Sequence, residues 1–283
     1  MKRLLLSFFA FSLLVLTVPC VPKLFDTPED RSVIHVLHAA DGTVYPLSAE
    51  DYVLGVMESA GYDEGDETMK AIAAALRSSA LYCEKTRPVH KEAAVCDDPD
   101  CCMAFRTDVF SEKALRAVAE TAGMAVPWEG IPACCPVCED AGGRTASCEQ
   151  QYGVFMPYLV SVTELFPCAP EVLTVPMERV LAVFGEGAVE GEPVFACDGS
   201  GRVREVRCGD SVCDGALFAE TLGLPSLLYT VVSDGNAYRF SCFGRGDGVG
   251  LSVGGASRME QNGYTYKEIL GFYFPGTIFG AFD

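Results

Sequence analysis

The stretch that decides the fold is residues 51–86, which read DYVLGVMESAGYDEGDETMKAIAAALRSSALYCEKT. In its second half an acidic pair at 66–67 is followed by apolar side chains at helical spacing, namely Met69, Ile72, Leu76 and Cys83. Acidic residues favour the first turn of a helix, and an apolar stripe of this period is typical of a helix that buries one face. The stretch therefore predicts a long helix packed against a core.

Strand patterns lie on both sides of this helix. In residues 32–48, apolar and polar side chains alternate around a glycine turn, which indicates a hairpin. Residues 123–138 indicate a second hairpin, which turns at Glu129 and Gly130. Residues 208–213 indicate a third, with Gly-Asp in its turn. Further helices are expected at 112–121, 175–184, 257–261 and 267–273. Because strands and helices mix without regular alternation, we predict an α+β fold with mixed sheets and several helices, not a wound parallel sheet.

Charge excludes one class of partner. The formal net charge is −18 over 283 residues, and an acidic surface repels nucleic acid and anionic lipid headgroups unless a basic patch compensates. The most basic cluster after the N-terminus is GRVREVR at residues 201–207, whose arginines alternate as on the outer face of a strand. We therefore expect no nucleic-acid partner.

The first residues have the pattern of an export signal. Two basic residues precede an uncharged apolar run from Leu4 to Pro22, which is about the length needed to span a bilayer. No small-x-small cleavage site follows the run, so we expect residues 1–25 to be retained as a membrane anchor, with cleavage as the alternative. Residues 26–283 then form one domain outside the cytoplasm.

The cysteines have three possible fates. Thirteen of the fourteen follow the anchor, and in an exported protein they pair, bind metal or persist as thiols. Cys208 and Cys213 are candidates for a cross-strand pair. His90, Cys96 and Cys102 lie at equal intervals of six with Cys101 adjacent, and imidazole and thiolates are the ligands that zinc prefers. We predict a zinc site at these three residues; the alternative is a disulfide at Cys96 beside a lone surface histidine.

The order of several motifs resembles the stage II sporulation protein D and amidase-enhancer family. From Tyr45 to Thr277 the motifs are DYVLGV before an Ala-rich helix with Arg77, CDDPDCCMAF, GGRT at 142–145, PYLVSV, SGRVREVR, GRGDGVGLS and GYTYKEILGFYFPGT. The resemblance implies an exported lytic transglycosylase that cuts peptidoglycan glycan strands during forespore engulfment, with engulfment proteins or an amidase as partners. It also implies zinc in the His90 region, where Cys134, Cys135 or Cys138 would supply a fourth ligand.

The position of the catalytic acid departs from the family pattern. A lytic transglycosylase needs one carboxyl group to protonate the glycosidic oxygen, and the glutamate that supplies it in the family aligns with Ala60. The nearest carboxyl group is Glu58, two residues earlier, which is the candidate catalytic residue. The alternative is a solvated glutamate beside an inactive site.

The glycine-rich stretch GRGDGVGLSVGGA at residues 244–256 needs positive φ or a close approach to its backbone. In the resemblance it lines the single glycan-binding cleft, which makes Gly244, Arg245, Gly246, Asp247 and Gly248 candidate substrate-binding residues, with Arg77 and Arg144 ordering the cleft. The alternatives are a turn-rich corner packed against its own domain and arginines that make structural hydrogen bonds. Three functions stay open: an active glycan-cleaving enzyme, a catalytically silent binding relative, and an amidase enhancer.

Overall fold

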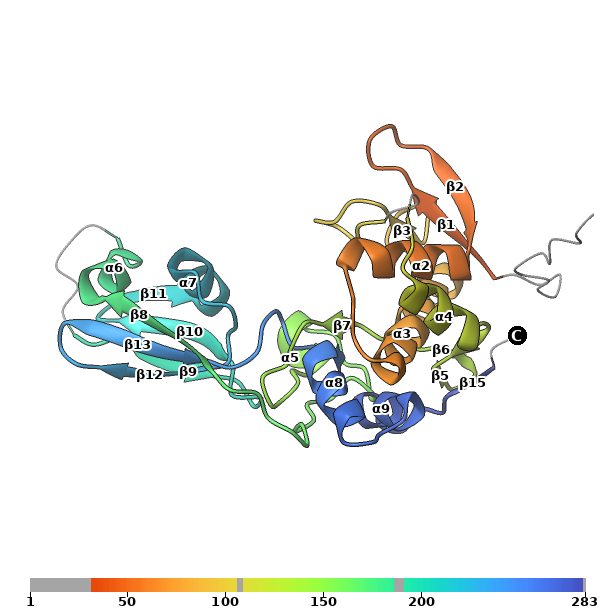
Figure 1. Cartoon of the computed structure of the whole chain (residues 1–283). Coiled ribbons are helices and arrows are strands. Elements are labelled where there is room, and N and C mark those ends of the chain that lie inside the picture. The colour runs from red at the N-terminus through yellow and green to blue at the C-terminus, as the bar shows by residue number, and fades with distance from the viewer. Residues whose placement is uncertain (1–31, 106–108, 186–190, 282–283) are drawn as a thin grey trace, which may run out of the picture. The chain divides into compact units, whose positions relative to one another are not determined.

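The computed structural model describes residues 32–105, 109–185 and 191–281 (Figure 1). The predicted anchor at residues 1–25 lies outside these ranges. Within them, no helix is both long enough and apolar enough to cross a membrane. The residues from Ser32 on form one compact unit, and their buried apolar side chains gather in two separate cores.

A hairpin of strands β1 (Val33–Leu37) and β2 (Val44–Ser48) begins the first core. The two strands are antiparallel, and the short strand β3 (Val95–Cys96) pairs with β1 in parallel. Ile34 and Val36 are fully buried while Val33 is exposed, so the alternation in the sequence correctly predicted this hairpin. The parallel strand places Cys96 at the edge of the same sheet.

The stretch 51–86 contributes to two helices, not one. Helix α2 (Ala49–Ala60) begins after Ser48, whose hydroxyl accepts a hydrogen bond from the Asp51 amide, and it ends at Gly61 in the left-handed region. Helix α3 (Asp66–Lys85) is the predicted helix. It packs against α2, α4 (Glu112–Glu120) and the C-terminal helices, so apolar residues around most of its circumference are buried.

Short ladders and C-terminal helices complete the first core. Strand β4 (Met124–Ala125) pairs with β15 (Gly280–Ala281), β5 (Pro127–Trp128) with β6 (Ile131–Pro132), and β7 (Val137–Cys138) with β14 (Leu251–Ser252). Helices α5 (Cys148–Tyr152), α8 (Val253–Gln261) and α9 (Tyr266–Tyr273) add buried side chains to the same core. Glu129 and Gly130 both have positive φ, which is typical of the tight hairpin turn that the sequence predicted there.

The first turn of α3 is capped by a residue that is distant in sequence. The Glu260 carboxylate, on α8, accepts hydrogen bonds from the Glu67 and Thr68 amides, both at 3.1 Å, and from the Thr68 hydroxyl at 2.7 Å. The residue that precedes α3 is Gly65, and a Cβ built there would lie 2.3 Å from this carboxylate. Glycine therefore leaves the space that the carboxylate occupies.

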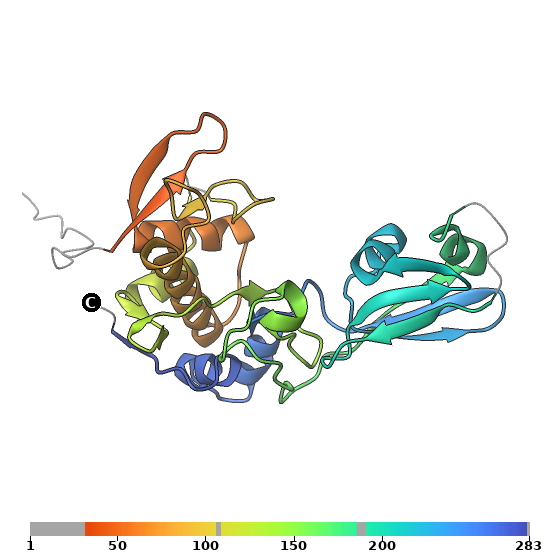
Figure 2. The ribbon, with the colours of Figure 1, turned by 180° about the vertical axis from the view of Figure 1, so that it is seen from behind.

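The second core is built from the described residues between 171 and 242, which form two three-stranded sheets and two helices. One sheet has the order β12 (Tyr229–Ser233), β13 (Ala237–Cys242), β8 (Glu171–Pro176); the other has β11 (Ser211–Asp214), β10 (Val203–Cys208), β9 (Val194–Cys197). Helices α6 (Met177–Ala182) and α7 (Gly215–Leu222) belong to the same core. These segments, coloured from green to blue, lie together in both views (Figure 1 and Figure 2), and the mixture of sheets and helices confirms the α+β prediction.

Two elements of the second core differ from the sequence prediction. The helix expected at 175–184 begins only at Met177, because the β-branched residues before it extend strand β8 as far as Pro176. Helix α7 was not predicted. Asp214 caps it by accepting hydrogen bonds from the amides of Ala216 and Leu217. An aspartate before an apolar run can indicate the start of a helix, but it follows directly on the predicted hairpin at 208–213 and was not interpreted in this way.

The expected outward alternation of arginines at 201–207 is wrong for Arg202. A bulge interrupts the pairing of β10 with β9 between Val203 and Glu205, and Arg202 is only 1% exposed. Its guanidinium donates to the Ala141 carbonyl at 2.9 Å and to the Ser200 hydroxyl at 3.2 Å. The residue is therefore part of the interior and not of the surface.

The cysteines of the β10–β11 hairpin do not pair. The hairpin forms as predicted, but its register sets Cys208 opposite Ser211 and Cys213 opposite Val206. The two thiols are thus diagonal neighbours, whose Cβ atoms lie about 7 Å apart in such a ladder, and a disulfide needs about 4 Å. The cysteines that the structure describes are all free thiols.

Candidate functional site

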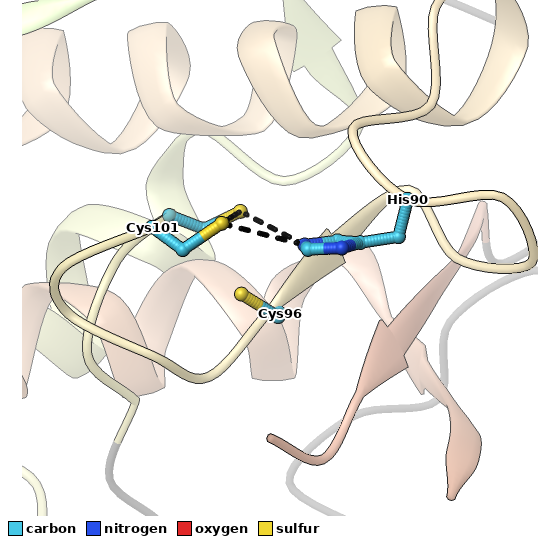
Figure 3. A group of neighbouring side chains, drawn as sticks. His90, Cys96 and Cys101 are labelled. Carbon is cyan, nitrogen blue, oxygen red and sulfur yellow. Dashed lines mark hydrogen bonds between the residues drawn. The ribbon is translucent and has the colours of Figure 1, made fainter. Parts of the chain in front are cut away.

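Four side chains converge beside the first sheet: His90, Cys96, Cys101 and Cys102 (Figure 3). The His90 Nε2 atom lies 3.7 Å from the Sγ atoms of Cys101 and Cys102, and these two sulfurs are 4.0 Å apart. All four ligand atoms lie within 4.8 Å of one another. One histidine and three cysteines therefore face a common point.

Backbone hydrogen bonds hold the two loops that supply these side chains. The His90 amide donates to the Ala93 carbonyl at 3.1 Å, which closes a tight turn before β3. After β3, the Asp98 carbonyl accepts from the amides of Cys101 and Cys102 at 3.2 and 2.9 Å. Cys96 lies on β3 itself and is 2% exposed, so the cluster is built on a strand with a fixed turn at either end.

The geometry of the cluster fits a tetrahedral metal ion. Zinc bonds of about 2.0–2.3 Å to nitrogen and sulfur place neighbouring ligand atoms about 3.5–3.8 Å apart around the metal. The separations of 3.7 and 4.0 Å in this cluster are close to those edges. Four protein donors fill a tetrahedron, which is the arrangement of a structural zinc site and not of a catalytic one with an open position.

The fourth side chain of the cluster is not one of the cysteines that the family resemblance implied. Cys101 takes this place, although the sequence analysis noted it only as a neighbour of Cys102. Cys138 lies on β7, opposite Ser252 of β14, and the Cys135 amide donates to the Ser79 hydroxyl at 2.8 Å. Among the described residues, the cluster of potential metal ligands contains none of Cys134, Cys135 and Cys138.

Glu58, the candidate acid, lies in the last turn of α2 and binds the start of another helix. Its Oε1 atom accepts hydrogen bonds from the amide and from the hydroxyl of Ser111, each at 2.6 Å. Ser111 is the N-cap residue of α4, where an anionic side chain is stabilised by the helix dipole. Ala60, at the family position of the acid, is exposed at the end of α2.

Arg77 is buried and has protein partners for its donors. It is 1% exposed, and it forms an ion pair with Glu50 together with a hydrogen bond to the Met124 carbonyl at 3.0 Å. It also donates to the Thr121 hydroxyl at 3.3 Å. This position favours the structural alternative for Arg77, because the guanidinium ties α2 to the end of α4 and leaves no surface for a glycan.

The protein's own chain approaches the glycine-rich loop. Gly244, Gly246, Gly248 and Gly250 all have φ between 72° and 87°. A Cβ would lie 2.3 Å from the Asp140 carbonyl oxygen at Gly244, 1.9 Å from the Arg202 guanidinium at Gly248, and 2.1 Å from the Pro136 carbonyl oxygen at Gly250. Only Gly246 is open. Packing within the protein therefore accounts for most of the bare backbone that the resemblance assigned to a glycan.

The charged residues in and near the glycine-rich loop use only some of their donor and acceptor atoms within the protein. Arg245 forms ion pairs with Glu139 at 3.3 Å and Glu171 at 3.0 Å. Asp247 accepts a hydrogen bond from the Tyr152 hydroxyl. Arg144 is exposed and donates through Nε to the Ser161 hydroxyl at 3.0 Å. Among the described residues no hydrogen bond or ion pair joins Glu58 to this loop, so the structure does not bring the two halves of the predicted site together by direct contact.

A charged network behind the loop was missed by the sequence analysis. Arg258 donates to Asp140 at 2.7 Å and to Glu164 at 3.1 Å, and Glu164 also accepts from the Tyr273 hydroxyl at 2.8 Å. Burial and the Glu164 charge raise the pKa of Tyr273, so its phenol stays a donor. The sequence signal that could have indicated this network is the glycine at position 255. A Cβ there would lie 2.0 Å from Glu164 and from Tyr273, so the network leaves no room for a side chain.

Comparisons with known proteins agree with the resemblance. Residues 40–128 match the family model described as "Stage II sporulation protein". The chain is similar to an uncharacterized protein of Brachyspira hyodysenteriae, at 27% identity over 82% of this chain and 67% of the relative. It is also similar to the stage II sporulation protein D of Bacillus subtilis, at 24% identity over 88% of this chain and 79% of the relative. The matched segment includes α2, α3 and the His90 cluster, and together with these relatives it supports the resemblance to the stage II sporulation protein D family.

Proposed function

We propose that this protein is a sporulation cell-wall protein that binds peptidoglycan without cleaving it, and that the His90 cluster holds a structural zinc ion. Similarity to the stage II sporulation protein D family supports a role at the cell wall during sporulation. The proposal places the described domain outside the cytoplasmic membrane, where residues 1–25 would anchor it. Engulfment proteins would then be its neighbours.

The observation that supports a silent site is the position of Glu58. Both hydrogen bonds to its Oε1 atom come from the N-cap residue of α4, and a carboxylate used in this way closes a helix end. It would have to leave these partners to protonate a glycosidic oxygen. The side chain at the family position, Ala60, has no proton to give.

A cleavage assay tests this proposal. Purified peptidoglycan is incubated with the wild-type protein and with Glu58→Gln, and soluble fragments are separated by chromatography while bound protein is measured in the pellet. We expect both proteins to bind the pellet and neither to release fragments. Fragment release by wild type that Glu58→Gln abolishes would overturn the silent site in favour of a lytic transglycosylase, and absence from the pellet would overturn peptidoglycan binding.

The zinc site is tested by metal analysis with a matched pair of cysteine variants. We expect one zinc ion per chain in the wild type and in Cys197→Ser, because Cys197 is an exposed thiol outside the cluster. Cys102→Ser removes one of four donors, so its zinc content and melting temperature should both fall. Equal zinc content in the two variants would contradict the assignment.

A further inference from the structure

An open hollow lies on the solvent-facing side of the sheet β12–β13–β8. Its volume is about 240 Å³, and it is lined by Thr174, Val232, Asp234, Ala237 and Arg239. Arg239, on the central strand β13, pairs with Thr174 on β8 and with Val232 on β12. Directly paired residues project to the same side of a sheet, so an arginine stands between a hydroxyl group and an apolar side chain.

The guanidinium of Arg239 is available to a ligand. Within the described ranges it makes no hydrogen bond or ion pair. Arg207, on the central strand of the other sheet, is a useful comparison, because it is also exposed but forms an ion pair with Glu205. A free guanidinium offers donors in a planar fork that matches the two oxygens of a carboxylate. The hollow is thus centred on an unused carboxylate-binding group.

Asp234 supplies a fixed negative charge at the end of the same hollow. Its Oδ1 atom accepts hydrogen bonds from the amides of Asn236 and Ala237, each at 2.9 Å. These backbone hydrogen bonds lower the pKa of Asp234, so the carboxylate stays ionised. No donor from the described part of the chain reaches Oδ2, and Asp234 forms no ion pair with Arg239. Neither charged group has a direct partner for these donor and acceptor atoms among the described residues, and the nearby charge of Arg239 also helps to lower the pKa of Asp234.

We propose that this hollow binds an α-amino-acid group in its zwitterionic form, with the ligand's carboxylate on Arg239 and its ammonium on Asp234 Oδ2. Val232 and Ala237 would contact the carbon atoms, and the Thr174 hydroxyl would donate or accept at the side. A zwitterion suits a chain with a net charge of −18, because it brings no net negative charge to an acidic protein.

Two sources could present such a group. One is a free amino acid, and the other is the end of a diamino-acid side chain in a peptidoglycan stem peptide. The second source rests on the proposed function, because it requires the domain to reach the cell wall. The binding of the group itself does not depend on it, and we assign the stem peptide as the source.

Calorimetric titration of the wild-type protein tests the binding. The probes are the tripeptide L-alanyl-γ-D-glutamyl-meso-diaminopimelate, the same tripeptide with lysine in place of the diamino acid, and free diaminopimelate. The lysine peptide keeps the ammonium but lacks the neighbouring carboxylate, so we expect it to bind at least about tenfold more weakly. Equal affinity for the two tripeptides, or no binding of any probe, would overturn the proposal.

Three variants locate the site. Arg239→Gln should lose at least about tenfold in affinity for the diaminopimelate peptide, and Asp234→Asn should lose a similar factor while its amide oxygen still accepts the two turn amides. Arg207→Gln is the matched control on the other sheet and should bind as wild type does. Similar losses in Arg239→Gln and Arg207→Gln would place the binding elsewhere.

Pelleting with whole peptidoglycan separates this inference from the proposed function. If the diaminopimelate peptide binds but no protein pellets, the zwitterion site stands and the cell-wall role fails. If wild type and Arg239→Gln pellet equally, the cell-wall role stands and the stem peptide as the source is overturned. Tighter binding of free diaminopimelate than of the tripeptide would assign the site to a free amino acid.

Discussion

Gly246 and Gly248 show how the same backbone conformation can meet different surroundings. Both have positive φ, at 87° and 76°, so alanine would be strained at either position. At Gly246 the nearest atom to an added Cβ is 4.0 Å away, whereas at Gly248 the Arg202 guanidinium is 1.9 Å away. The requirement for glycine therefore has two separable parts, backbone strain and exclusion by a buried cation.

Alanine at these two positions should give unequal losses of stability. We expect Gly246→Ala to cost about 1 kcal/mol from strain alone. Gly248→Ala should cost about 3 kcal/mol or more, because it must also displace the guanidinium of Arg202, a buried residue with few partners. Urea unfolding followed by circular dichroism measures both. Equal losses would mean that Arg202 moves aside without cost.

Helix α9 depends on a capping box whose strength should follow pH. The Glu268 carboxylate accepts from the amide and the hydroxyl of Thr265, at 2.8 and 2.7 Å. The backbone hydrogen bond from Thr265 is the main cause of the lowered pKa of Glu268. A carboxylate with a lowered pKa in the folded protein stabilises it above its ordinary pKa of 4.5 and loses this effect as the pH falls through the lowered value.

The difference in stability between wild type and Glu268→Gln should therefore be present at neutral pH and shrink below about pH 4. Thermal unfolding at several pH values measures it. Glu220→Gln is a suitable control, because it changes one exposed glutamate in helix α7 away from the N-terminal turn. A constant difference across the range would contradict the capping role.

Elements with strong local signals were predictable from the sequence, and elements set by distant contacts were not. The hairpin at 32–48 and helix α3 have clear apolar periods. The turn at Glu129 and Gly130 has an equally local cause in its residue types. The last two residues of strand β8, Val175 and Pro176, were taken for the start of a helix because their partner strand β13 lies more than sixty residues later in the chain.

The candidate site was predictable only where its residues are close in sequence. His90, Cys96 and Cys102 lie within thirteen residues, and the structure brings them together as expected. Cys101 was noted but not assigned, since spacing does not reveal that two adjacent thiols both face the same point. The roles of Arg77 and Gly248 depend on Glu50 and Arg202, and such distant partners leave no trace in a local pattern.

The segment with the second core begins and ends on paired strands. Glu171, the first residue of β8, is the register partner of Cys242, the last residue of β13. The two points where this segment meets the rest of the chain are therefore adjacent, and its apolar core is separate from the first one. A segment of this kind is removable in principle without breaking the first core.

A variant in which a short Gly-Ser linker replaces residues 171–242 should remain folded. It loses the Arg202 bond to Ala141 and the ion pair between Arg245 and Glu171, so we expect a lower melting temperature but one zinc ion per chain. It should also lose binding of the diaminopimelate peptide. Metal analysis and calorimetry check both expectations, and loss of zinc would show that the first core needs the second.

The contact between Glu260 and the start of α3 also has a consequence for synthesis. Glu260 lies 193 residues after Glu67, whose amide donates to its carboxylate. The residues of helix α3 are therefore synthesised long before Glu260 leaves the ribosome. Until then the first turn of the helix has free amide groups and a space beside Gly65 that water must fill. The first core should thus reach its full cooperativity only late in translation, and a ribosome stalled before residue 260 would hold a protease-sensitive intermediate.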